Sequence, residues 1–288
     1  PQKKYDKVGE MYKEALKRNS NLDLEQPFKS GGKVIKTVHG AIRNEAETIY
    51  NQGSKYYTKG KKKKAEKSFK MSIELNPNLI DNYLALSDLS YDQGNIQGAI
   101  DYLDMGSKYD SKNFLIFIKK SIYLKELKEY DEAILTLQNI EINDSDIQIT
   151  IDYEIFKLNM DKENYPKAAA LGSQVVENMF NSTSIDDVVL AEACYNVAIC
   201  NRYLGYEGYN KTVDIINQGI DDKDILSSTL IDAKLAIDYF KVAKERFYDA
   251  SSFDPDDQKS AGYAKDLNKL IKQLKKLFIP SIEDLLEQ

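Results

Sequence analysis

The sequence predicts an all-α solenoid built from helix-turn-helix repeats. A pattern of small, aromatic and helix-breaking residues recurs every 34 or 35 residues. Within each copy, apolar residues return with the period of an amphipathic helix. The composition, with 42% hydrophobic and 30% charged residues, supplies enough apolar surface for a core. The 288 residues are therefore interpreted as an array of repeats and not as two globular domains.

Two elements are expected before the array. Residues 1–20 carry Tyr5, Val8 and Tyr12 at the spacing of one helix face, which predicts an N-terminal helix that resembles half a repeat. Residues 21–41 contain a proline and three glycines and show no helical period. We expect this second segment to be a flexible linker.

The first complete repeat contains the clearest signal. Gly60 predicts a tight turn between the first helix of the repeat (helix A) and the second (helix B), because a glycine readily adopts turn conformations. Ala65 and Phe69, four residues apart, predict the buried face of helix B, and Pro77 predicts its end. The complete pattern consists of Gly53, Tyr56, Gly60, Ala65, Phe69, Ser72 and Pro77.

Three further copies follow, so that four repeats are expected over residues 42–182. The fourth copy departs from the pattern, because Gly172 stands where helix B should carry a bulky residue. The copies are marked by Gly94 and Ala99, by Tyr130 and Ala133, and by Tyr165 and Ala168.

These residues resemble the tetratricopeptide-repeat (TPR) pattern over about residues 42–260. The resemblance implies a right-handed superhelix whose concave face, lined by helix A side chains, binds a peptide or protein. The function expected is a non-catalytic interaction scaffold. The alternative is a self-assembling structural subunit that uses its charge-polarised ends and a long hairpin.

The fifth repeat, over residues 183–257, is expected to be much longer than the others. Its helix A begins near Ala191, but the helix B marker, Phe240 with Ala243 and Phe247, comes about 33 residues later than the standard spacing. Because the helical period continues through the insertion, both helices are predicted to be longer by about 16 residues. The acidic run at residues 221–224 is the predicted tip of a projecting hairpin.

The last segment, residues 258–288, is expected to be a capping helix and a tail. Leu267, Leu270 and Leu274 lie on one face of this helix, with lysines on the other. Pro280 is expected to end it.

The charge is polarised along the chain. The first 72 residues hold 18 Lys and Arg against 8 Asp and Glu, whereas the rest holds 22 against 38. Opposite charge at the two ends favours contacts between copies and leaves a homo-oligomer open. The overall charge of −6 argues against nucleic acid as a partner.

A periplasmic or exported location of the protein is expected in preference to a cytoplasmic one. The lengthened hairpin resembles that of exported TPR proteins of Bacteroidetes, which implies a bacterial source. The chain begins with Pro1 and not Met, which leaves open an export signal or a lipid anchor on a removed segment. The sequence contains no run of 18 apolar residues, so no membrane-spanning helix is predicted.

No catalytic, cofactor or metal site is predicted. His39 is the only histidine and is expected in the linker, which argues against zinc sites and histidine-dependent catalysis. Cys194 and Cys200 are six residues apart on one predicted helix, point in different directions, and are expected to be buried apolar residues.

The partner-binding residues are therefore expected on the helix A segments. Tyrosines dominate this set, and they are interpreted either as partner contacts or as packing against the next repeat. Leu115, Ile118 and Ile122 form an apolar row that is interpreted either as groove floor or as core. The candidate residues are Tyr50, Tyr57, Leu84, Asp88, Tyr91, Ile118, Ile122, Lys125, Tyr153, Lys157, Tyr195 and Arg202.

Overall fold

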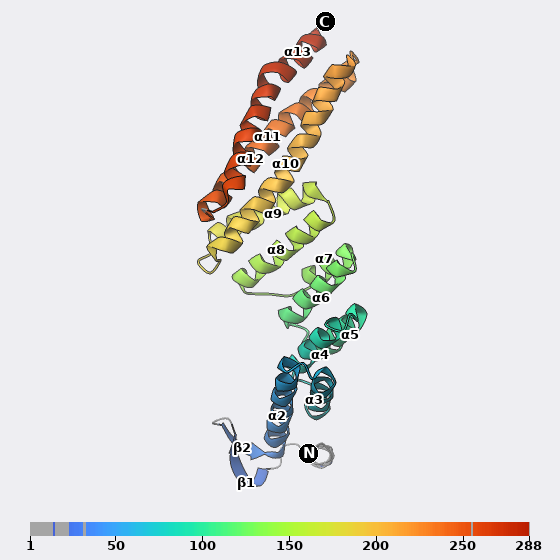
Figure 1. The fold of residues 1–288 in the computed structure, drawn as a ribbon, viewed down its shortest axis with the longest axis vertical. Coiled ribbons are helices and arrows are strands. Elements are labelled where there is room, and N and C mark those ends of the chain that lie inside the picture. Colours follow the sequence, from blue (N-terminus) through green and yellow to red (C-terminus); the bar gives the residue numbers. More distant parts are fainter. Residues whose placement is uncertain (1–13, 15–22, 31–32, 255, 288) are drawn as a thin grey trace. The chain divides into compact units, whose positions relative to one another are not determined.

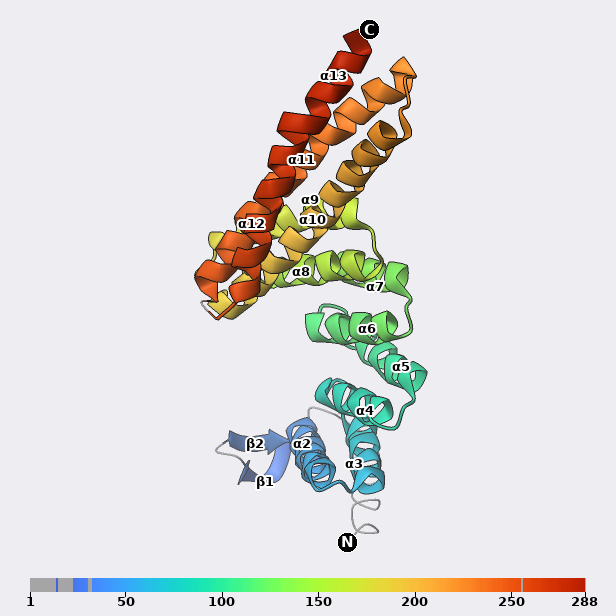
Figure 2. The ribbon, with the colours of Figure 1, turned by 45° about the horizontal axis from the view of Figure 1, so that its top comes forward.

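The computed structural model describes residue 14, residues 23–30, residues 33–254 and residues 256–287 (Figures 1 and 2). Apart from one β-hairpin, the fold is the predicted array of helix pairs, and the chain divides into two compact units between Glu141 and Ile142. The predicted helix over residues 1–20 lies outside the described residues, apart from Glu14.

The N-terminal unit contains three helix pairs. In each pair helix A packs on helix B, and helix B of one pair contacts helix A of the next. The pairs are α2 (Val38–Thr58) with α3 (Lys62–Leu75), α4 (Asp81–Tyr91) with α5 (Ile96–Ser107), and α6 (Phe114–Glu126) with α7 (Tyr130–Gln138).

The expectation of a linker at residues 21–41 is wrong. Strands β1 (Asp23–Ser30) and β2 (Lys33–Thr37) form an antiparallel hairpin in its place. The sequence between the strands is Gly-Gly, a pair that favours two-residue hairpin turns. The register is irregular between Asp23 and Phe28, around the proline, which has no amide hydrogen for the ladder. Thr37 then caps α2 by accepting a hydrogen bond from the Gly40 amide at 3.0 Å.

The predicted packing of the first repeat is confirmed. Ala65 and Phe69 are buried, and their cluster includes Leu86 and Leu89 of the next repeat. A Cβ atom on Gly53 would lie 2.7 Å from the Phe69 ring, so the small residue lets α2 approach α3. The core of this unit therefore runs from repeat to repeat, as in a solenoid.

The turn between helix A and helix B has the same left-handed backbone in four repeats. Gly60 and Gly94 have φ of 69° and 80°. The equivalent residues in the next two repeats are Lys128 and Glu163, with φ of 61° and 59°. A residue with a Cβ is strained in this conformation, whereas glycine adopts it readily.

We therefore expect Lys128→Gly to stabilise the protein. Relief of backbone strain should exceed the added freedom of the unfolded chain, and the free energy of unfolding should rise by about 0.5–1 kcal/mol. The matched control is Gly94→Ala, which has no neighbouring atom within 4 Å to clash with and should be destabilising by about 1 kcal/mol. Urea denaturation followed by circular dichroism measures both, and a decrease for Lys128→Gly would contradict the strain.

The C-terminal unit contains two further helix pairs and a C-terminal helical segment. Figure 1 shows the two long helices of its second pair lying beside that segment. The elements are α8 (Ser145–Asp161), α9 (Tyr165–Phe180), α10 (Asp187–Gln218), α11 (Lys223–Phe253), α12 (Gln258–Gln273), a π-helical turn η1 (Leu274–Phe278) and α13 (Ile279–Glu287).

The long hairpin occupies the residues for which the sequence predicts it. Gly219 ends α10 in the left-handed conformation, and the Asp222 carboxylate caps α11 by accepting hydrogen bonds from the Asp224 and Ile225 amides. Close packing holds the two helices together, because a Cβ atom on Gly205 would lie only 2.4 Å from the Phe240 ring.

The expectation that Pro280 ends the last helix is wrong. The helix widens into η1, where the Ile279 amide donates to the Leu274 carbonyl, five residues earlier. Such a turn accommodates the missing amide hydrogen and the bulk of the proline ring, so the chain continues as α13. Ile282 of α13 is buried, and Lys234 of α11 pairs with Glu283 at 3.4 Å. The hairpin is therefore covered along one side by the C-terminal segment.

The unexpected Gly172 in the fourth repeat also has a structural reason. A Cβ atom there would lie 2.6 Å from the Phe156 ring and 2.8 Å from Val197. Phe156 of α8 fills the space that a bulky helix B residue takes in the usual pattern.

Candidate functional site

The candidate residues of the N-terminal unit come from α2, α4 and α6. On α6, Leu115 is 48% exposed and Ile122 is 43% exposed, while Ile118 between them is half-buried. Their positions, three and four residues apart, place them on one face of the helix. These three residues are called the α6 stripe below. This exposure places Leu115 and Ile122 on the surface and not in the core.

The tyrosines of this unit link one helix A to the next. The Tyr57 hydroxyl of α2 donates to the Asp92 carboxylate at 2.7 Å, and the Tyr91 hydroxyl of α4 donates to the Glu126 carboxylate. The two tyrosines are 34 residues apart, and so are the two acidic residues. The same link therefore recurs in successive repeats. The structure thus assigns these tyrosines an inter-repeat contact, the second of the two sequence interpretations.

A second contact between α4 and α6 centres on Asp88. Its carboxylate pairs with the Lys119 ammonium and accepts a hydrogen bond from the Tyr123 hydroxyl at 3.1 Å. The Tyr91 and Tyr123 rings stack with centroids 4.9 Å apart. Burial raises the pKa of Tyr123, so its hydroxyl stays protonated and remains a donor. These contacts fix the position of α6 relative to α4 before any partner binds.

The other candidate residues of this unit differ in exposure. Tyr50 packs on Phe69, with ring centroids 5.7 Å apart, and is partly buried. Leu84 is half-buried on α4, and Lys125 is exposed at the end of α6. The surface that α4 and α6 offer to a partner therefore combines apolar side chains with the Asp88–Lys119 ion pair, and Lys125 adds a charge at the end of α6.

We expect the link at Tyr57 to make stability depend on alkaline pH. The hydrogen bond to Asp92, then burial, raises the pKa of Tyr57 to about 12 from an ordinary value of 10. The folded state therefore favours the protonated phenol, and this contribution to stability is complete below pH 10 and is lost as the pH rises through 12. Tyr57→Phe should make the fall in stability between pH 10 and 12 shallower.

Urea denaturation at several pH values in this range provides the measurement. Tyr130→Phe is a suitable control, because Tyr130 is a partly buried tyrosine of the same unit outside the described inter-repeat links. An unchanged pH dependence in Tyr57→Phe would contradict the role of the hydrogen bond.

In the C-terminal unit the candidate residues divide between core and surface. Tyr153 of α8 is buried, with the Lys157 ammonium 4.6 Å from its ring centroid, so the structure places this tyrosine in the core and not on the surface. Lys157 also pairs with Glu154 at 2.7 Å. Tyr195 of α10 is partly buried and packs edge-on against Phe247.

Arg202 of α10 lies beside a cavity of about 430 Å³. Its guanidinium carbon is 4.5 Å from the Tyr263 ring centroid of α12 and 5.8 Å from that of Tyr206. The residues that line the cavity are Ile199, Arg202, Tyr203, Tyr206, Glu207 and Asn210.

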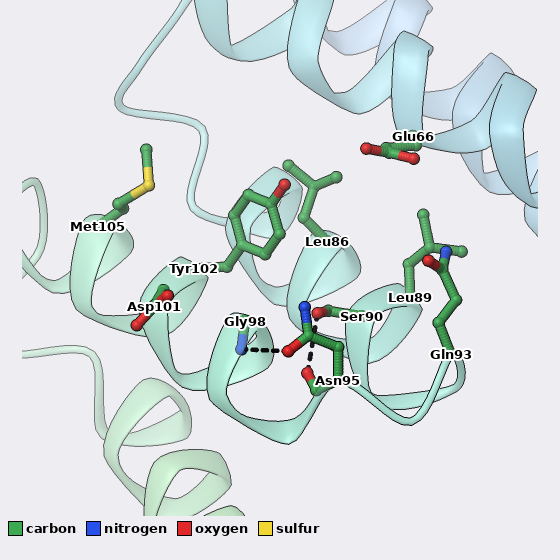
Figure 3. Close-up of a pocket in the computed structure, with 10 residues that line it drawn as sticks. All are labelled: Glu66, Leu86, Leu89, Ser90, Gln93, Asn95, Gly98, Asp101, Tyr102 and Met105. Carbon is green, nitrogen blue, oxygen red and sulfur yellow. Dashed lines mark hydrogen bonds between the residues drawn. The ribbon is translucent and has the colours of Figure 1, made fainter.

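The sequence did not reveal a cavity of about 340 Å³ between α3, α4 and α5 (Figure 3). Leu86, Leu89 and Tyr102 supply apolar surface to it. Its polar side chains hold the turn into α5: Asn95 accepts a hydrogen bond from the Gly98 amide at 3.0 Å, and Ser90 donates to the Asn95 carbonyl at 2.9 Å. The repeat pattern gave no signal for this cavity because its walls belong to two successive repeats.

The histidine and the two cysteines considered for catalysis lie in different surroundings. His39 lies exposed in the first turn of α2 and not in a linker. Cys194 and Cys200 are free and buried, and burial raises the pKa of each thiol to about 12, which disfavours the reactive thiolate. Among the residues that the structure describes, no group of three or more His, Cys, Asp or Glu side chains could hold a metal ion. No helix in the same part of the chain is long and apolar enough to cross a membrane.

Solved structures with a similar arrangement of helices include TPR proteins. YrrB, described as a TPR protein with an unusual peptide-binding site, is 14% identical, with a TM-score of 0.48 over 77% of this chain and 90% of that chain. A TPR protein from Bacteroides fragilis is 18% identical, with a TM-score of 0.42 over 78% and 99%. The C-terminal part of one from Cytophaga hutchinsonii is 14% identical, with a TM-score of 0.47 over 90% and 94%. No family profile and no curated protein matches the chain.

Proposed function

We propose that this chain, whose helix pairs have the TPR fold, is a non-catalytic scaffold that binds a polypeptide on the helix A face of its N-terminal unit. The observation that carries the proposal is the α6 stripe. Leu115 and Ile122 expose nearly half of their surface on a face that the neighbouring helices do not cover. Exposed apolar rows of this kind are typical of surfaces that a partner covers.

The surroundings of the stripe favour a partner that is itself apolar and extended or helical. The nearest charged groups on α4 and α6 are already engaged, Asp88 with Lys119 and Glu126 with Tyr91. They hold the helices in place and leave the apolar side chains as the free binding surface. An amphipathic helix or a short apolar segment, with anchors three or four residues apart, matches such a row. Because the surface is fixed in advance, little ordering free energy is lost on binding.

Selection from a random peptide library on the immobilised chain tests the proposal. We expect enriched sequences with two or three apolar side chains at regular spacing and few charges beside them. A parallel selection on Leu115→Asp/Ile122→Asp identifies which sequences require the stripe. Enrichment of the same sequences on both proteins, or no enrichment on either, would contradict the proposal.

A second candidate function is self-assembly through the long hairpin. It is favoured by Ile231 and Leu235 of α11, which are both exposed and lie four residues apart on one face of the helix. Leu235 also lines a cavity of about 270 Å³. Light scattering at low and high salt tests it. A mass that stays that of one chain at both salts and at high concentration would exclude it.

A further inference from the structure

We infer that Arg202 and the cavity beside it form a binding site for a single carboxylate on a partner polypeptide. This site belongs to the C-terminal unit. It goes beyond the proposed function, which rests on the N-terminal unit, and it assigns the long hairpin a recognition role of its own.

The first step is the way in which the Arg202 guanidinium is held. It lies near two aromatic rings, 4.5 Å from the centroid of Tyr263 on α12 and 5.8 Å from that of Tyr206 on α10. Aromatic rings at such distances attract a guanidinium but take none of its five N–H donors. The donors at its edge remain available to an acceptor.

The second step is that the charge of Arg202 has no acidic partner among the described residues. Arg246 of the same unit shows the contrast. Its guanidinium pairs with Glu177 and, at 3.0 Å, with Asp249, and so it has a structural role. A partly buried arginine that lies beside aromatic rings and pairs with no carboxylate can offer its donors to an acceptor on a partner.

The third step is the shape and chemistry of the cavity beside it. Ile199 and the rings of Tyr203 and Tyr206 give it apolar walls, and Asn210 adds an amide. Tyr203 is itself fixed, because its ring stacks on Tyr165 of α9 with centroids 4.0 Å apart. One cation beside aromatic and aliphatic walls fits a carboxylate that carries a neighbouring apolar side chain. Planar, two-pronged pairing with a carboxylate is the geometry that a guanidinium provides best.

Glu207 argues against a ligand with several negative charges. It lines the same cavity, one helical turn beyond Tyr203, and it would repel a second anionic group. Arg202 is the only cation among the residues that line the cavity. A nucleic acid or another polyanion would need several cations in a row, so the site favours a peptide carboxylate.

Calorimetric titration of the full chain tests the inference with three short peptides. They are acetyl-Gly-Gly-Phe-Leu with a free C-terminal carboxylate, the same peptide as its C-terminal amide, and acetyl-Gly-Glu-Phe-Leu amide. We expect at least one carboxylate peptide to bind at least about 10-fold more tightly than the uncharged amide, since a hydrogen bond to a charged group is stronger than one between neutral groups. The carboxylate peptide that binds more tightly shows whether the site prefers a carboxylate at a chain terminus or one on a side chain.

Variants separate a recognition role from a structural one. Arg202→Gln should abolish the preference for the carboxylate, and Arg202→Lys should retain only part of it because the two-pronged geometry is lost. The control Arg43→Gln removes the same charge from an exposed site on α2 and should leave the preference intact. Circular dichroism shows whether each variant is folded.

Several results would overturn the inference. The first is equal binding of the amide and the carboxylate peptides. The second is an unchanged preference for the carboxylate peptide in folded Arg202→Gln. The third is tighter binding of inorganic phosphate than of either carboxylate peptide. Its failure is distinguishable from failure of the proposed function, because Leu115→Asp/Ile122→Asp should leave the carboxylate preference unchanged.

Discussion

Phe240→Ala is expected to lower the free energy of unfolding of the C-terminal unit by about 3–5 kcal/mol. Phe240 is fully buried in α11, and its ring occupies the space that Gly205 leaves on α10. It also contacts Tyr206 and Tyr209, with ring centroids 5.5 and 6.4 Å away. Its removal leaves a cavity where the two long helices approach each other, and urea denaturation followed by circular dichroism measures the loss.

Two further variants make this result specific. Tyr248→Ala removes an exposed ring from the same helix and should lower the free energy of unfolding by less than about 1 kcal/mol. Gly205→Ala should be destabilising in the natural chain, where its Cβ meets the Phe240 ring, and much less so when Phe240 is already alanine. Additive effects of Gly205→Ala and Phe240→Ala would show that these two residues do not share one packing site.

Leu115→Asp/Ile122→Asp is expected to weaken binding of a selected peptide by about 30-fold or more, because truncating or charging the anchors of an interface removes about 2 kcal/mol or more. Both side chains are exposed, so the folded state should lose little stability. Calorimetry with the peptide selected on the natural chain measures the affinity.

The matched control for this variant is Leu135→Asp. Leu135 is 57% exposed, more than Leu115 or Ile122, but it lies on α7, the helix B of the same repeat. Its replacement should leave the affinity unchanged. Equal losses in the two proteins would mean that general surface hydrophobicity, and not the helix A face, attracts the peptide.

The repeats and the long hairpin were predictable because their signals are local and periodic. The positions of Gly60, Ala65 and Phe69 have equivalents at fixed spacing in later repeats. The number of residues between Ala191 and Phe240 indicates how much longer the fifth repeat is. The left-handed turn was predictable where Gly60 and Gly94 mark it. At Lys128 and Glu163 the same turn is imposed by the flanking helices against the preference of the residue.

Other features depend on contacts that sequence spacing does not reveal. The β1–β2 hairpin was missed because the glycines of this segment were given more weight than its β-branched residues. The sequence of such a short two-stranded ribbon then resembles that of a linker. Pro280 was expected to end a helix, since a π-helical turn that accommodates proline has no periodic signature. Helix A tyrosines were identified, but their partners, such as Asp92 for Tyr57, lie in the next repeat.

The sequence therefore predicted which residues lie on the helix A segments, but not what surrounds them. The helix A face and the apolar row on α6 follow from the repeat register. Exposure alone distinguishes Ile122, which is available to a partner, from Tyr153, which is buried. Exposure depends on how neighbouring repeats pack, and a single sequence does not specify this.

Photo-crosslinking tests most directly the claim that a polypeptide binds on the helix A face of the N-terminal unit. A photoreactive phenylalanine analogue is placed singly at Leu84 or Ile122 on helix A segments, and at Met105 or Leu135 on helix B segments. A selected peptide should crosslink at positions 84 and 122 and not at 105 or 135. Crosslinks at the helix B positions alone would contradict the account.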